Sequence, residues 1–279
     1  MSKNNKIQSK IIGLDMGLSF GKFFLDSEDL HFGYWPNGEK PTSKNFAWAQ
    51  ENHSNLIINQ IPKDAKKILD VGSGSGNLAL KIKNLGYIVD CVIPSKYLAR
   101  SVTNKLGEQS AIHICKFENI ELDCKYDTII FSESFQYVNI HSSLALIEKL
   151  LSPGGTLIIC DFFQLDVNET SLMGGGHNWG AFLKAVENTS LISLIDNDIT
   201  EGTAPTIDYL NRFCQEVLQP ISSMTKEYLL SNYPKLTKLL LWRFKKRLQK
   251  INNRYLSGDV NGKSFKKFKT YRLLTYKKI

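Results

Sequence analysis

The stretch from Lys66 to Leu80 constrains the fold of this chain more than any other, because it has the pattern of a strand, a glycine turn and a helix. The strand is an apolar run, typical of a parallel strand covered on both faces, formed by Ile68, Leu69 and Val71. Glycines that leave the backbone open to a ligand then stand at alternate positions, Gly72, Gly74 and Gly76. The helix expected from position 77 points its N-terminus at this turn. The turn is therefore a candidate anion-binding site.

The glycine spacing excludes the dinucleotide fingerprint G-x-G-x-x-G, whose third glycine would fall where Asn77 stands. The pattern is instead G-x-G-x-G with Asp70 two residues before the first glycine. This resembles motif I of the class I S-adenosylmethionine (SAM) dependent methyltransferases. The resemblance implies that the glycines admit the methionine part of SAM and that Asp70 and Ser73 help to form its site. A plain tight turn between strand and helix is the alternative.

Two later segments extend the resemblance in the expected order. Residues 126–130 read YDTII, and residues 151–155 read LSPGG before the apolar run 156–160. The resemblance implies an α/β, Rossmann-like, seven-stranded and mostly parallel sheet with an antiparallel last strand and helices on both faces. Further strands are expected at 87–93, 111–115, 191–195 and 270–276.

Four regions follow from this reading. Residues 1–62 form a helical and aromatic entry segment, 63–200 the SAM-binding core, 201–268 a basic helical insert and 269–279 the last strand. The insert carries an apolar stripe, for which there are three readings. It packs on the core, it closes over the substrate as a lid, or it binds a surface as an amphipathic helix. These three roles stay open at this point.

The family resemblance also implies further cofactor contacts. The second strand ends at Ser95 without the carboxylate that usually holds the ribose, so Ser95 is the candidate, and Asp90 stands too early in the strand. Phe117 and Glu118 are expected near the adenine. At the exit of the fourth strand, the residues expected to face the cofactor are Ser132 and Glu133.

Methyl transfer from SAM needs positioning, and a base only where the acceptor must lose a proton. The candidates for acid–base work are His177 on a glycine-rich loop, Glu133 and Tyr137. Glu133 stands among aromatic residues, which would raise its pKa; such a carboxylate could also stabilise a cation or hydrogen-bond to SAM. No cluster of His, Cys, Asp and Glu has metal-ligand spacing, so no metal is expected.

Aromatic residues dominate the expected substrate side, with few charges among them: Tyr34, Trp35, Phe135, Phe162 and Trp179. They favour methyl transfer to an oxygen or carbon of a small, apolar or aromatic metabolite, such as a natural product, quinone or lipid-like molecule. A nucleic-acid methyltransferase and a SAM-binding protein without catalysis are the alternatives.

Charge is distributed unevenly along the chain. Residues 226–279 hold sixteen Lys and Arg against Glu227 and Asp259, a net +14, while the whole chain carries +8. This predicts a solvated surface or attraction to an anionic partner, with peripheral membrane contact through 234–269 as one expectation and nucleic acid as a weaker one. Five cysteines without paired spacing indicate reduced thiols in a cytoplasmic protein.

Overall fold

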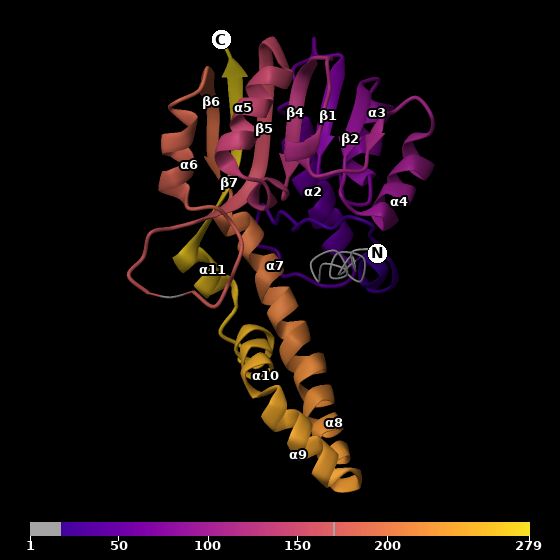
Figure 1. Cartoon of the computed structure of the whole chain (residues 1–279), viewed down its shortest axis with the longest axis vertical. Coiled ribbons are helices and arrows are strands. Elements are labelled where there is room, and N and C mark those ends of the chain that lie inside the picture. The colour runs from indigo at the N-terminus through magenta and orange to yellow at the C-terminus, as the bar shows by residue number, and fades with distance from the viewer. Residues whose placement is uncertain (1–17, 170) are drawn as a thin grey trace, which may run out of the picture.

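The computed structural model describes residues 18–169 and 171–279 and has a seven-stranded sheet between two layers of helices (Figure 1). Residues 1–17 of the predicted entry segment lie outside this part. The strands are β1 (Lys67–Val71), β2 (Ile88–Val92), β3 (Ile112–His113), β4 (Tyr126–Ser132), β5 (Leu151–Gln164), β6 (Leu191–Asp198) and β7 (Lys269–Lys278).

Strand order across the sheet is β3-β2-β1-β4-β5-β7-β6. The first five strands pair in parallel, and β7 runs antiparallel between β5 and β6. The predicted fold class is therefore confirmed, including the antiparallel last strand.

Successive side chains of the central strands point to opposite faces of the sheet, so each face has its own hydrophobic core. In β1, Ile68 joins one buried cluster and Leu69 joins the other. The first cluster is covered by α2 (Phe46–Ile58), α3 (Asn77–Asn84), α4 (Lys96–Leu106), α7 (Thr200–Phe213) and α11 (Gly262–Phe268). The second is covered by η1 (Phe117–Asn119), η2 (Phe135–Tyr137), α5 (Ile140–Leu150) and α6 (Trp179–Val186).

Several strands differ in length from the prediction, among them β5 and β3. β5 continues to Gln164 because β7 pairs with it from Thr156 to its end, so the strand has a partner beyond the reach of β4. β3 is only two residues long, and it is an edge strand that pairs with β2 alone. Strand length here follows the neighbours that are available, which the sequence of one segment does not reveal.

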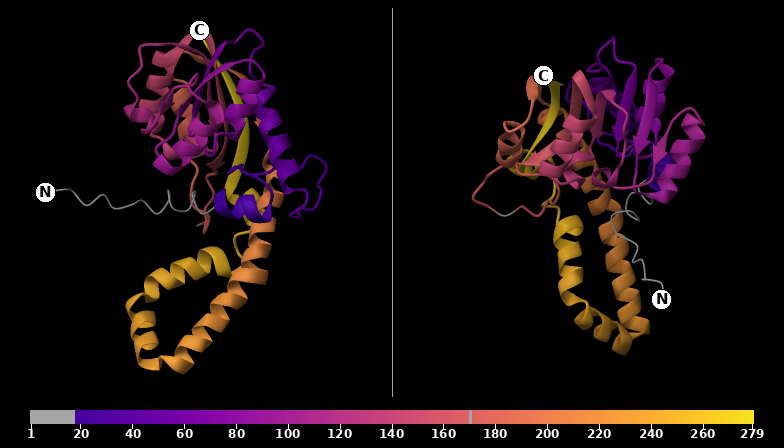
Figure 2. Two further views of the ribbon diagram at one scale, coloured as in Figure 1. Left: turned by 90° about the vertical axis from the view of Figure 1, so that its right-hand side faces the viewer. Right: turned by 45° about the horizontal axis from the view of Figure 1, so that its top comes forward.

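The predicted insert forms a helical arm that projects from the sheet (Figures 1 and 2). Its outgoing limb continues α7 through η3 (Cys214–Leu218) into α8 (Gln219–Asn232). The chain reverses at Tyr233 and returns through α9 (Pro234–Arg243), α10 (Lys245–Ile251) and η4 (Asn252–Leu256). Pro234 suits the first helical position, where no backbone N–H is needed. Within the described ranges, no helix is long and apolar enough to span a membrane.

A segment that we call the N-terminal strap, residues 29–35, crosses from α2 to α7. Gly33 N donates to Thr206 Oγ1 at 3.1 Å, and Trp35 N donates to Gly202 O at 2.8 Å. Gln50 Nε2 in α2 donates to two strap carbonyls. Hydrogen bonds at both ends thus fix the strap between two helices of the same layer.

Candidate active site

The parallel strands direct their carboxyl ends to one edge of the sheet, where the predicted motifs meet. The glycine turn after β1 has positive φ at Gly72 (78°), Gly74 (55°) and Gly76 (86°). A Cβ on Gly72 would lie 2.4 Å from Ser134 Cβ, and one on Gly76 would lie 3.1 Å from Val102 Cα. Two glycines are thus required by the packing of the protein itself.

Gly74 differs from the other two glycines of the turn. A Cβ there would meet only the side chain of Leu30 in the strap, at 3.7 Å. The position therefore faces the strap with room to spare, which is what the approach of a ligand to this backbone needs.

Two buried polar atoms next to this turn lack a partner among residues 18–169 and 171–279. They are Oδ2 of Asp70, at the end of β1, and Oγ of Ser132, at the end of the neighbouring β4. Burial raises the pKa of Asp70 to about 7, against the opposing effect of the Ser73 hydroxyl. An acceptor without a donor suits an ammonium group such as that of SAM. These residues and the open Gly74 fit the cofactor that the motif implies.

Glu133 is the second carboxyl of the site; it is part-buried and follows β4 directly. Its φ of 49° is unusual for a residue with a side chain, and its N–H donates to Cys160 O at 2.8 Å. Oε1 accepts hydrogen bonds from Phe32 N at 2.6 Å and from the Tyr271 hydroxyl at 2.8 Å. Burial nevertheless dominates and raises the pKa of Glu133 to about 8. This carboxyl therefore holds a proton at neutral pH and joins the strap to the sheet.

Tyr271 and His53 form a buried extension of Glu133 that sequence reasoning missed. The Tyr271 hydroxyl donates its hydrogen to Glu133, so His53 Nε2, 2.8 Å away, must donate to the Tyr271 oxygen. Burial holds the pKa of His53 well below its usual range, which keeps the imidazole neutral. The available signals were a histidine in the helix before motif I and a tyrosine in the apolar last strand.

Asp161 in β5 is the third carboxyl of the site, and it is buried. It accepts hydrogen bonds from Gln136 N at 2.9 Å, Gln136 Nε2 at 3.1 Å and Phe162 N at 2.8 Å. Burial raises its pKa to about 7 despite these donors. Gln136 also reaches the glycine-rich loop, since its Oε1 lies 3.4 Å from Gly176 N. Asp161 thus positions η2 and, through Gln136, the loop beside it.

The other two predicted catalytic residues stand near this group. His177 Nε2 lies 2.9 Å from Phe135 O, and because a carbonyl only accepts, this nitrogen carries the hydrogen. His177 O accepts from Gln164 N at 2.7 Å, so the loop is fastened to β5 and η2. Tyr137 is exposed, and desolvation together with the charge of Glu133 raises its pKa to about 12. Their catalytic roles stay predictions.

The predicted ribose and adenine residues each have a structural partner. Ser95 Oγ caps α4 by accepting from Leu98 N at 3.2 Å. Glu118 Oε1 accepts from Asn139 N at 2.9 Å, and Phe117 is buried edge-on to Phe131. Their contacts with the cofactor stay predictions.

Asp90 has partners of its own in the sheet. Its two oxygens accept hydrogen bonds from Ala111 N and the Tyr126 hydroxyl, both at 2.9 Å. The carboxyl also lies 3.2 Å from the Lys67 ammonium. These partners account for a carboxyl in the middle of β2.

The predicted substrate residues fall into separate groups. Phe162 packs with three other rings beside Glu133, from Phe32, Phe265 and Tyr271. Phe135 and Trp179 lie in the opposite layer, where both contact the ring of Phe182. Trp35 is buried with Nε1 bonded to Thr206 Oγ1, and the ring of Tyr34 packs on Gly202. The ring of Phe162 thus lies beside Glu133, while the rings of the other four residues pack elsewhere.

Comparison with known proteins finds methyltransferases among the proteins similar to this chain. A family model described as a methyltransferase domain matches residues 69–159. An uncharacterized methyltransferase of Alkaliphilus oremlandii is 25% identical over 154 residues, which are 52% of this chain and 71% of that protein. Uncharacterized methyltransferases of Bacillus strains match over 56% of their length.

Solved structures share the fold over nearly the whole chain. Geranyl diphosphate C-methyltransferase of Streptomyces coelicolor, in complex with S-adenosyl-L-homocysteine, is 13% identical with a TM-score of 0.65, covering 99% of this chain and 95% of that one. The [4+2]-cyclase SpnF is 15% identical with a TM-score of 0.65, covering 96% and 93%. At these identities the likeness concerns the fold, and one architecture accommodates enzymes named for different reactions.

Proposed function

Because the chain is a class I SAM-dependent methyltransferase, we propose that it methylates an oxygen or a carbon of a small, largely apolar or aromatic metabolite. SAM, when bound, supplies an electrophilic methyl group that needs no further activation. The work left to the chain is to exclude water, to orient the acceptor and to take up a proton where the acceptor must lose one.

The observation that carries the proposal is a protonatable carboxyl beside a group of aromatic rings. Glu133 is part-buried, and its hydrogen-bond partner Tyr271 belongs to the same group as Phe32, Phe162 and Phe265. Three of these rings are buried, and Phe32 is part-buried, so Phe32 is the ring of this group that we propose as an apolar contact surface for the acceptor. The names of solved neighbours, a geranyl diphosphate C-methyltransferase and an O-methyltransferase called StiE, support small acceptors of this kind.

Glu133 is the residue that we propose for proton transfer. Its pKa of about 8 means that the ionised form, which accepts a proton from the acceptor, becomes populated on the alkaline side of neutrality. Tyr271 holds the carboxyl in place, and neutral His53 holds Tyr271. Turnover limited by this group rises with pH towards a plateau above 8.

The test is transfer of labelled methyl from SAM to a panel of phenols, quinones, isoprenoid diphosphates, fatty acyl compounds, RNA and DNA. We expect transfer to one of the small acceptors, lost by at least a hundredfold in Glu133→Gln while the affinity for SAM stays within a few fold. The matched control is Glu187→Gln, an exposed residue at the end of α6. Transfer to nucleic acid alone would overturn the proposal, and unchanged turnover in Glu133→Gln would remove the role given to Glu133.

A further inference from the structure

The helical arm exposes apolar side chains that nothing in the described chain covers. None of the residues of α8 or α10 is buried, and α9 buries only Thr237. The most exposed large hydrophobic side chain of the arm is Trp242, at 71%. Others on the returning limb are Leu236, Leu239, Leu240, Phe244, Leu248, Ile251 and Tyr255.

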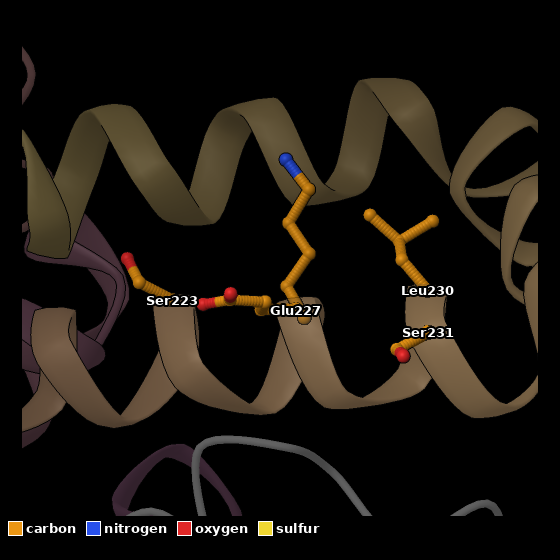
Figure 3. Close-up of a pocket in the computed structure, with 5 residues that line it drawn as sticks. Ser223, Glu227, Leu230 and Ser231 are labelled. Atoms are coloured by element: carbon orange, nitrogen blue, oxygen red, sulfur yellow. The ribbon is translucent and has the colours of Figure 1, made fainter.

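The two limbs of the arm do not bury these side chains against each other. Figure 2 shows the limbs spread apart beyond the core. A hollow on the inner side of α8 is lined by residues of this helix only, and Leu230 points from it toward the facing helix (Figure 3). The limbs do touch near the tip, where Thr237 Oγ1 donates to Leu229 O at 2.9 Å. A large apolar surface on a monomer marks a site of interaction.

The same limb is strongly and uniformly basic. From Pro234 to Gly258 there is no acidic residue, and the eight cations are Lys235, Lys238, Arg243, Lys245, Lys246, Arg247, Lys250 and Arg254. Among the described residues, none of the ion pairs involves any of these eight. These charges are therefore available to an external anion.

We propose that the returning limb, residues 234–256, docks on the surface of an anionic lipid bilayer. Large apolar residues interleaved with Lys and Arg let a helix bury its apolar side chains at the acyl boundary while its cations meet the headgroups. Limb helices of ten and seven residues are too short to span, so they lie in the plane of the interface.

Charge complementarity favours a bilayer over two other possible partners, a second copy of the arm and a nucleic acid. A second copy of the arm would bring eight more cations against the first eight, with no acid on this limb to offset them. A nucleic acid would engage the cations but leave Leu236, Leu239 and Trp242 in water. An anionic bilayer satisfies both kinds of side chain together.

The base of the limb adjoins the candidate active site. The Arg254 guanidinium lies 3.7 Å from where a Cβ on Gly174 would stand, in the glycine-rich loop that carries His177. Docking would thus hold the site close to the membrane surface. The docking itself depends on the arm alone, so it does not rest on the identity of the acceptor.

Co-sedimentation of the full chain with vesicles tests the proposal. We expect binding to phosphatidylcholine vesicles that contain phosphatidylglycerol or phosphatidylserine, weakened by salt, and little binding to pure phosphatidylcholine. Replacing three cations by Lys245→Gln, Lys246→Gln and Arg247→Gln should lower partitioning by roughly a hundredfold, since each cation contributes about fivefold.

Two further variants separate charge from apolar contact. The control Lys44→Gln, Lys63→Gln and Lys184→Gln removes three exposed cations of the core and should bind as the wild type does. Trp242→Gln should weaken binding, and wild-type tryptophan fluorescence should shift to the blue with anionic vesicles. Absence of binding, equal loss in both triple variants, a preference for RNA or DNA over vesicles, or self-association through the arm would each overturn the proposal.

Discussion

Glu133→Gln should flatten the dependence of stability on pH, because it removes a carboxyl whose ionisation the fold opposes. Burial raises the pKa of Glu133 from 4.5 to about 8. A folded pKa above the unfolded one gives stability that is complete below the unfolded value and is lost as pH rises through the folded value. Each pH unit between the two values costs about 1.4 kcal/mol of unfolding free energy, so the loss reaches about 4 kcal/mol by pH 8 as an upper bound.

The difference between wild type and Glu133→Gln between pH 7 and 8 isolates this residue, because the other groups that titrate there, among them Lys269 with a pKa of about 8, are common to both proteins. Asp70 and Asp161 act in the same direction, but their pKa values of about 7 place most of their effect at lower pH. Urea unfolding from pH 5 to 8 should show the wild type losing about 1 kcal/mol over the last unit and Glu133→Gln losing clearly less. The control Glu187→Gln should follow the wild type. Equal slopes in wild type and Glu133→Gln above pH 7 would refute the reasoning.

Three further outcomes follow from the site. Gly72→Ala should lower the free energy of unfolding by roughly 2 kcal/mol or more, measured by denaturant titration, because the new Cβ would meet Ser134 at a residue with positive φ. If ionised Asp70 receives the cofactor's ammonium, SAM affinity should fall about tenfold per pH unit below 7, and calorimetry should find this slope absent in Asp70→Asn. Tyr271→Phe removes a donor to Glu133, so the alkaline rise of the pH–rate profile should move to higher pH, and an unmoved profile would contradict the role of Tyr271.

The sheet was predictable because its signals are local. Apolar runs bounded by turns locate β1, β4 and β5, and the glycine turn defines the first crossover. Strand lengths were less predictable, because the length of β5 depends on its pairing with β7, which follows more than a hundred residues later. The insert was expected to be helical. Its projection from the sheet was not predictable, because whether these helices pack on the core depends on the whole fold.

The site was predictable only where a motif names the residue. The sequence indicated Asp70 and Glu133 by their place at strand ends, and the structure shows Asp70 buried and Glu133 part-buried, with burial raising the pKa of both. It did not indicate Tyr271 and His53, which reach Glu133 from β7 and α2. It grouped Trp35 and Trp179 with Phe162 by composition, whereas packing distributes them over different parts of the molecule. Contacts between distant segments are not encoded in local spacing.

Calorimetric titration of SAM into the wild type and Gly74→Asp tests the central claim most directly. A Cβ at Gly74 would meet only Leu30, at 3.7 Å, and aspartate tolerates positive φ, so the variant should fold, as a thermal melt can verify. The account predicts micromolar binding to the wild type and none to the folded variant. Equal binding to both proteins, or none to the wild type, would contradict a cofactor site at this turn.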